Sequence, residues 1–279
     1  MFNVSIPRCN LHTHTSFCDG RETPEEIVQA AIRQGMTAIG FSGHSPMPYP
    51  NDFAMTERSL YEYREEILRL RRAYEGKIEV LLGIEQDYLS GHPYGRYDYI
   101  IGSVHTMMID GKVYELDNTK EELLRAVREQ FRGDIYLLLQ RYFEMVGQLV
   151  DVTDCNIIGH FDLVTKFNED GSLFDERDPR YLLPAYAAID RLAKREVLFE
   201  INTGAVARGY RRLPYPSLPL LRRIALRGCR VVINSDAHSA DKLLYKFDEA
   251  VMIANNIGFG SVSVLTRDGW RLFRNGKFL

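Results

Sequence analysis

The stretch CNLHTHTSFCDG, residues 9–20, decides how the chain begins to fold and raises the first question about its chemistry. A short apolar run leads into two histidines, His12 and His14, which are separated by a single residue. In an extended strand, side chains two residues apart point to the same face. The two imidazoles should therefore project together from the end of a first strand, and Asp19 follows shortly after them.

The rest of the chain repeats this beginning, because short apolar runs alternate with longer amphipathic stretches. The expected strands are residues 9–13, 37–42, 78–85, 97–105, 155–160, 196–202, 230–236 and 261–266. The expected helices are residues 23–35, 55–76, 119–127, 134–150, 179–195 and 217–228. Such alternation predicts a parallel sheet, and near-continuous apolar strands are typical of a sheet covered on both faces. We therefore expect an α/β fold, and the number of strands favours a barrel.

Composition narrows the classes of function. The chain has 279 residues, 45% of them hydrophobic, which suits a single domain over residues 1–279. Its net charge of −3 argues against broad nucleic-acid binding, which needs a basic surface. No apolar run approaches the ~20 residues of a membrane span. The start of the chain also lacks signal-peptide features, so we expect a cytoplasmic protein that binds no membrane.

Side chains that bind metals stand at the ends of six expected strands. The nine candidate ligands are His12, His14, Asp19, His44, Glu85, His105, His160, Asp236 and His238. A lone histidine at a strand end is more often a core residue, but nine such positions are hard to explain by chance. The carboxyl ends of barrel strands meet at one rim, where active sites are built. Imidazole and carboxylate ligands suit zinc, iron or manganese, and nine exceed the four of a structural zinc site.

The charge of such a cluster predicts the kind of substrate. Two or three divalent ions carry more positive charge than Asp19, Glu85 and Asp236 neutralise. The site should therefore attract an anion, and phosphate is the natural candidate. Neighbouring metal ions can also generate hydroxide and hold both oxygens of an in-line displacement.

Together these motifs resemble the polymerase and histidinol phosphatase (PHP) family. The matching motifs, in the family's order across nearly the whole chain, are H-x-H at 12–14, SGH at 42–44, GIE at 83–85, GSVH at 102–105, IGH at 158–160 and SDAH at 235–238. The motifs FSGHSP, GIEQDY, GHFDLV and EINTG, and a helix-bearing insertion between His105 and His160, look most like the histidinol-phosphatase branch. One departure is Gly43, because the family commonly has aspartate before this histidine; the ligand His44 itself is retained.

The resemblance implies a distorted seven-stranded (β/α) barrel, similar to a TIM barrel, with two or three zinc, iron or manganese ions. The resemblance implies three ligand sets: His12, His14, Glu85 and Asp236; Asp19, His44 and His238; and Glu85, His105 and His160. Glu85 belongs to the first and the last of these sets and would bridge their two metal ions. A hydroxide between the metals would attack phosphorus. Asp236 and His238 are the candidate catalytic residues, since either could pass a proton to the leaving group, as could a metal-bound water.

Three further residues are candidates to bind the substrate. Arg208 follows a strand end in INTGAVARGYRR and offers a planar fork that matches phosphate oxygens. Lys166 follows the strand that leads to His160. Asp87 lies two residues beyond Glu85 and could act behind the metals or bind a substrate amine. The alternative for each of the three is a solvated loop residue.

The resulting hypothesis is a metal-dependent phosphomonoesterase, a histidinol-phosphatase that hydrolyses L-histidinol phosphate in histidine biosynthesis. Its expected partner is a small phosphate ester, with no nucleic acid, and the sequence leaves the oligomeric state open. One alternative is a PHP phosphodiesterase or exonuclease, which needs a basic groove with stacking aromatic residues. A phosphatase for another small molecule also remains open. A non-catalytic PHP module would have lost metal ligands, and none is missing here.

Overall fold

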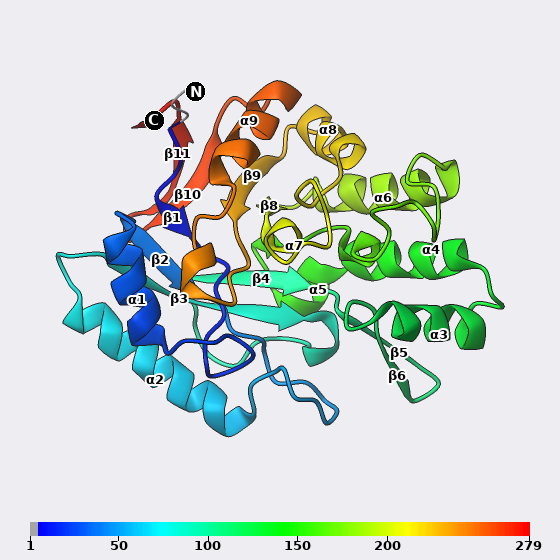
Figure 1. The fold of residues 1–279 in the computed structure, drawn as a ribbon, viewed down its shortest axis with the longest axis horizontal. Helices are drawn as coiled ribbons and strands as arrows, with labels where there is room; N and C mark the ends of the chain where they lie inside the picture. Colours follow the sequence, from blue (N-terminus) through cyan, green and yellow to red (C-terminus); the bar gives the residue numbers. More distant parts are fainter. Residues whose placement is uncertain (1–4) are drawn as a thin grey trace.

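The computed structural model describes residues 5–279, in which one ten-stranded sheet curls on itself (Figure 1). In spatial order its strands are β1 (Cys9–Asn10), β2 (Ala38–Phe41), β3 (Glu79–Asp87), β4 (Tyr99–Ser103), β7 (Ile157–Ile158), β8 (Leu198–Asn202), β9 (Arg230–Asn234), β10 (Val262–Thr266), β11 (Gly269–Arg274) and β12 (Lys277–Phe278). All pairs from β1 to β10 are parallel, which confirms the predicted α/β class. A separate antiparallel hairpin consists of β5 (Thr106–Ile109) and β6 (Lys112–Glu115).

Seven of the parallel strands form the barrel, and one bridge closes it. Strands β1 to β4 and β7 to β9 follow one another, and Thr13 then pairs in parallel with Ala237 just beyond β9. At this seam the His14 amide donates to the Ala237 carbonyl at 2.9 Å, and the Ala237 amide donates to the His12 carbonyl at 3.0 Å. Strand β10 pairs with β9 at a single position and leaves the ring. The distorted seven-stranded barrel implied by the family resemblance is therefore confirmed.

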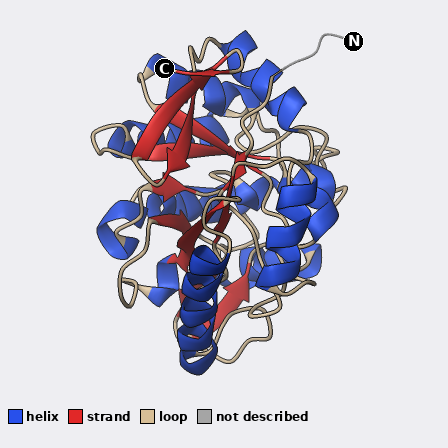
Figure 2. Ribbon diagram, turned by 90° about the vertical axis from the view of Figure 1, so that its left-hand side faces the viewer, coloured by secondary structure: helices blue, strands red, loops and turns tan. Residues whose placement is uncertain are grey.

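Helices cover the outside of the curled sheet (Figure 2). They are α1 (Pro24–Arg33), α2 (Glu57–Ala73), α3 (Lys120–Gln130), α4 (Ile135–Val146), α5 (Leu149–Thr153), α6 (Pro179–Leu192), α7 (Gly204–Ala207), α8 (Leu218–Leu226) and α9 (Phe247–Ile257). Every expected helix is present, but the one expected over 134–150 is split at Gly147 into α4 and α5. The sequence patterns did not predict α7, α9 or the strands β5, β6, β11 and β12. Within residues 5–279, no helix is long and apolar enough to cross a bilayer.

Local signals set where the first two helices begin. Thr23 caps α1 by accepting from the Glu26 amide, while the Glu26 carboxylate accepts from the Thr23 amide at 2.9 Å. Thr56 and Ser59 form the same reciprocal arrangement at the start of α2. Caps of this kind stabilise a helix by about 1 kcal/mol each. They fix the loops that run from the barrel rim into these helices.

The barrel interior beneath the rim is filled by Tyr99 from β4. The single hydrogen of its hydroxyl is shared between the Leu11 carbonyl at 2.5 Å and the Phe41 carbonyl at 3.0 Å, so it ties β4 across to β1 and β2. The ring lies directly against Gly83 and Gly40. A Cβ at Gly83 would fall 2.2 Å from the ring, and one at Gly40 would fall 2.4 Å from the hydroxyl. Glycine is therefore required at both positions, because any side chain would overlap the ring.

Replacing Gly83 by alanine should lower the free energy of unfolding by about 1–3 kcal/mol, because the added methyl group overpacks the barrel interior. Urea denaturation of the purified protein measures this change. The matched control is Gly260→Ala, since a Cβ there meets no atom within 4 Å and the backbone is not left-handed. Equal stability of the two variants would contradict the proposed role of the Tyr99 contact.

Candidate metal centre

The structure brings all nine predicted ligands together at the carboxyl ends of the barrel strands. His12 and His14 follow β1, Asp19 lies in the next loop, His44 follows β2, Glu85 lies in β3, His105 follows β4, His160 follows β7, and Asp236 and His238 follow β9. The seventh histidine of the chain, His92, is exposed and pairs with Asp154 at 2.8 Å, as expected for a surface residue. Six histidines and three carboxylates therefore form one cluster.

The first ligand set consists of His12, His14, Glu85 and Asp236. His12 Nε2 lies 3.3 Å from Glu85 Oε2 and 3.6 Å from Asp236 Oδ1. His14 Nε2 lies 3.5 Å and 3.2 Å from the same two oxygens. Ligand atoms that share one metal ion at 2.0–2.2 Å stand about 3–3.5 Å from one another. These four atoms therefore have the spacing of a single coordination shell.

The second ligand set uses the other oxygen of Glu85. His160 Nε2 lies 2.9 Å and His105 Nε2 lies 3.3 Å from Glu85 Oε1. Ser103 Oγ donates to this oxygen at 2.6 Å and holds the carboxylate in place. Glu85 thus turns one oxygen toward each set, which is the arrangement of a bridging ligand.

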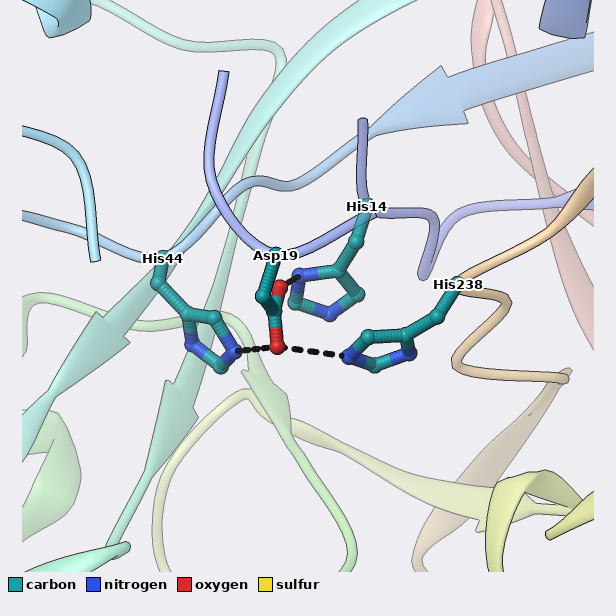
Figure 3. Close-up of side chains that lie close together, drawn as sticks. All are labelled: His14, Asp19, His44 and His238. Carbon is teal, nitrogen blue, oxygen red and sulfur yellow. Dashed lines mark hydrogen bonds and ion pairs between the residues drawn. The ribbon is translucent and has the colours of Figure 1, made fainter. Parts of the chain in front are cut away.

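The third set surrounds Asp19 (Figure 3). Asp19 Oδ2 lies 3.0 Å from His238 Nε2 and 3.6 Å from His44 Nε2, while Asp19 Oδ1 lies 3.3 Å from His14 Nδ1. The other ring nitrogen of His44, Nδ1, lies 3.0 Å from Glu85 Oε2. The third set therefore adjoins the first, and the three sets form one continuous centre.

The buried ligand atoms fit divalent metal ions. Among the described residues, His12 Nε2, His14 Nε2 and Glu85 Oε2 are buried without a hydrogen-bond partner. A buried polar atom that lacks a partner costs about 1–3 kcal/mol, so three of them at one point require an explanation. Neutral imidazole and carboxylate are the ligands that zinc, iron and manganese prefer. Metal coordination would satisfy these atoms and would account for their convergence.

The electrostatics of the cluster favour positive charge. Burial lowers the pKa of His12, but the carboxylates of Glu200, Glu85 and Asp236 outweigh burial and raise the pKa to about 10. The pKa of His44 rises to about 9 for the same reason, since nearby carboxylates again outweigh burial. Conversely, burial raises the pKa of Glu85, but the facing imidazoles bring it well below its usual range. The carboxylates therefore favour positive charge at this site, which either protons or metal ions would supply.

Two buried carboxylates stand behind the ligands. Glu200 Oε1 lies 2.7 Å from His12 Nδ1, and Asp87 Oδ2 lies 3.1 Å from His105 Nδ1. Such partners fix the orientation and the tautomer of metal-binding histidines. Glu200 was not predicted from the sequence, although a single carboxylate within the apolar run VLFEIN was a signal for it.

The expected contact of Asp87 with the substrate does not match its position. Asp87 Oδ2 also accepts from the His105 amide at 3.0 Å, and Asp87 Oδ1 accepts from the Leu89 amide at 2.8 Å. The side chain is buried and takes no part in the cavity wall. Asp87 therefore supports His105 from behind, because both of its oxygens are occupied by neighbouring groups.

The departure from the family pattern at Gly43 also has a structural counterpart. Cys18 Sγ lies 3.6 Å from His14 Nδ1. A Cβ at Gly43 would stand 3.3 Å from this sulfur and 3.1 Å from Met55 Cε. The space that an aspartate would need at position 43 is therefore filled by Cys18 and Met55.

A cavity of about 340 Å³ opens over the metal ligands, a volume that suits a small molecule. Its inner wall is made by Asp19, His44, Glu85, His105, His160, Asp236 and His238. The remaining wall is made by Asp52, Phe53, Thr106, Glu115, Asp117, Asn118, Leu163, Lys166, Arg208 and Tyr210. The ligands and a substrate-sized space thus belong to one site.

Both cations predicted to bind substrate reach this cavity. Arg208 Nη2 donates to Asp236 Oδ2 at 2.9 Å, and Arg208 Nη1 donates to the Asp236 carbonyl at 3.1 Å. Lys166 Nζ donates to the carbonyl of Asp117 at 2.5 Å and to its carboxylate at 3.2 Å. The ammonium group also lies 4.8 Å from the centre of the Tyr210 ring. Each cation is therefore held in position at the cavity wall.

A parallel barrel whose rim gathers these ligands beneath a small cavity defines a metal-dependent hydrolase. A model of the PHP domain matches residues 10–204, which run from β1 into α7. The chain belongs to the PHP domain family, as the resemblance of its motifs predicted.

Relatives and solved structures support this assignment. A probable histidinol-phosphatase of Deinococcus radiodurans is 32% identical and aligns over 91% of this chain and 95% of its own length. The histidinol-phosphatase of Bacillus subtilis is 25% identical over 85% of this chain and 96% of its own. The fold resembles a histidinol phosphate phosphatase of Lactococcus lactis in complex with zinc, L-histidinol and phosphate, with a TM-score of 0.70, 22% identity and coverage of 99% and 100% of the two chains.

Proposed function

We propose that this chain is a histidinol-phosphatase, which hydrolyses L-histidinol phosphate to L-histidinol and phosphate. The observation that carries the proposal is the complete set of nine ligands beneath a cavity whose wall also carries two cations and several carboxylates. The names of the relatives and their nearly full-length alignments support the same activity. We also propose that residues 1–279 form one PHP domain, since a single sheet runs from β1 to β12.

The inner half of the cavity would hold the phosphate group. Three ligand sets, two of which share Glu85, support three ions, and zinc, iron and manganese all suit these ligands. When bound, such ions would polarise phosphoryl oxygens and would lower the pKa of a water bound to them to about 7. Arg208 stands beside Asp236 and can offer its fork to phosphate oxygens. Lys166, which is paired with Asp117, adds a second positive charge to the lining of the cavity.

Two residues are placed to assist the departure of the alcohol. Asp236 and His238 both line the cavity, and His238 Nδ1 lies 3.0 Å from the Asp236 carbonyl. Arg208 Nη1 lies 3.2 Å from the same ring nitrogen. We propose that His238 or Asp236 passes a proton to the leaving oxygen when it is not bound to a metal ion, because both residues line the cavity.

Part of the cavity wall is acidic and would bind the cationic end of the substrate. It carries Asp52, Glu115 and Asp117. Burial raises the pKa of Glu115, and the neighbouring charges of Asp117 and Asp52 add to this rise. Crowded carboxylates favour a cationic ligand, and L-histidinol phosphate carries an ammonium group and an imidazole opposite its phosphate. The same wall repels a nucleic-acid backbone, which argues against the exonuclease alternative.

Replacing Glu115 by glutamine should raise KM for L-histidinol phosphate about 10–100-fold, because a hydrogen bond to a charged group contributes about 1.5–3 kcal/mol. The kcat/KM for p-nitrophenyl phosphate, which has no cationic end, should stay unchanged. Steady-state kinetics with both substrates measure the difference. The control is Glu121→Gln on the exposed surface of α3. An equal loss with both substrates would contradict the assignment of the acidic wall.

The proposed function is tested by measuring phosphate release from L-histidinol phosphate by protein of known metal content. A panel of other phosphate monoesters and a dinucleotide phosphodiester is measured in parallel. We expect fast release from L-histidinol phosphate and little cleavage of the diester. No release by metal-loaded protein would refute this substrate, and preferred cleavage of the diester would favour the phosphodiesterase alternative.

A further inference from the structure

Glu200, on β8, is a fully buried carboxylate that lies outside the three ligand sets. Its Oε1 accepts from His12 Nδ1 at 2.7 Å and from Asn234 Nδ2 at 2.9 Å. Its Oε2 accepts from the His160 amide at 2.8 Å and from Asn202 Nδ2 at 2.8 Å. Four donors therefore surround two oxygens, which matches the four acceptor sites of an ionised carboxylate.

Two of these donors cannot turn away from Glu200. Asn234 Oδ1 accepts from the Leu11 amide at 2.9 Å, so its NH₂ group must face the carboxylate. Asn202 Oδ1 accepts from the Gly204 amide at 2.8 Å and is fixed in the same way. Asn202 and Asn234 also pair with each other in register between β8 and β9. The pocket around Glu200 is therefore preset to receive acceptors at both oxygen positions.

We propose that Glu200 is a positioning residue for the metal centre, because it selects the tautomer of His12 and anchors the backbone of His160. This inference rests on the metal centre of the proposed function. When His12 donates its hydrogen from Nδ1, Nε2 keeps a free lone pair. This lone pair can bind the metal ion of the first set, which His12 would share with Glu85 and Asp236. The bond to the His160 amide fixes a residue of the second set. One carboxylate thus organises ligands of two sets.

A glutamine at position 200 would be unable to do this in either orientation. If its NH₂ group faced His12 Nδ1, the imidazole would have to accept there and carry its hydrogen on Nε2, where it can no longer bind a metal. If its NH₂ group faced the other way, it would point at the His160 amide and at Asn202 Nδ2, and these donors would face another donor instead of an acceptor. Each orientation therefore damages one ligand set, although the volume of the side chain is unchanged.

The experiment compares Glu200→Gln with the unaltered protein. Each is stripped with a chelator, titrated with Zn²⁺ and, after dialysis, analysed for bound zinc. We expect zinc affinity to fall by about 10–100-fold at the weakened set, as for other residues that orient metal ligands. The matched control is Asp162→Asn, which also replaces a fully buried carboxylate near the rim. Asp162 accepts from Tyr181 and Ser217 instead of a metal ligand, so this variant should bind zinc normally.

A second measurement uses the unaltered protein and does not depend on the folding of a variant. ¹⁵N NMR of histidine-labelled, zinc-loaded protein should show His12 with its hydrogen on Nδ1 and its Nε2 bound to zinc. Hydrogen on Nε2 of His12, or normal zinc affinity in a folded Glu200→Gln protein, would overturn the role of Glu200. Failure of the unaltered protein to bind zinc, iron or manganese would instead overturn the metal centre itself, together with this inference.

Discussion

We expect that replacing Glu85 by glutamine will lower the rate of phosphate release from L-histidinol phosphate by about 10³-fold or more. The reason is that metal ions contribute several kcal/mol to such reactions, and each 1.36 kcal/mol corresponds to a factor of ten. Glu85 Oε2 faces His12, His14 and His44, whereas Oε1 faces His105 and His160. A glutamine keeps the shape but offers only one acceptor oxygen, so it cannot serve both ligand sets.

The Glu85→Gln variant is tested by steady-state kinetics together with analysis of its metal content. Glu79→Gln is the matched control, because it makes the same chemical change at the opposite end of β3, away from the rim. We expect the Glu85 variant to lose both activity and bound metal and the Glu79 variant to lose neither. A Glu85→Gln protein with unaltered rate would refute a bridging role for this residue.

Removing the metals should abolish activity and should make the thermal stability of the protein depend strongly on pH. In the metal-free cluster the pKa of His12 is about 10 and that of His44 about 9, both above the usual value of 6.5. The stability contributed by these protonated histidines is fully present below pH 6.5 and is lost as pH rises through 9 to 10. The loss is on the order of a few kcal/mol, since one pKa unit corresponds to 1.36 kcal/mol.

Protons and metal ions compete for the same imidazoles, so metal affinity should rise over this range of pH. Melting temperatures of chelated and zinc-loaded protein, measured at pH 6.5 and at pH 9, test the prediction. The increase in melting temperature on zinc loading should be larger at pH 9, and activity should return with the metal. An increase that is the same at both values would contradict the competition.

The candidate metal centre could be predicted because its ligands follow simple spacing rules. His12 and His14 share a face through the period of a strand, and parallel strands bring their carboxyl ends to one rim. The supporting residue Glu200 escaped notice because it stands inside a strand rather than at its end. Its role depends on donors from three other parts of the chain, which no local pattern reveals.

The hairpin β5–β6 was missed for a different reason. Asp110 and Gly111 have φ values of 51° and 73°, which is typical of the two-residue turns that Asp-Gly favours. The turn signal was therefore present in the sequence, but the short strands on either side resembled a continuation of the run that ends at His105. The omission matters because Glu115, part of the acidic wall, stands at the end of this hairpin.

The seam between Thr13 and Ala237 has a consequence for the order of events during synthesis. Asp19 and His238 meet across it although 219 residues separate them in the chain. Contacts between such distant residues form late, because the long loop between them must first be closed. The metal-binding residues that are synthesised first, His12, His14 and Asp19, therefore complete their site only after the last barrel strand has formed. We expect that metal capture completes folding, and that bound ions then hold the first barrel strand to the last.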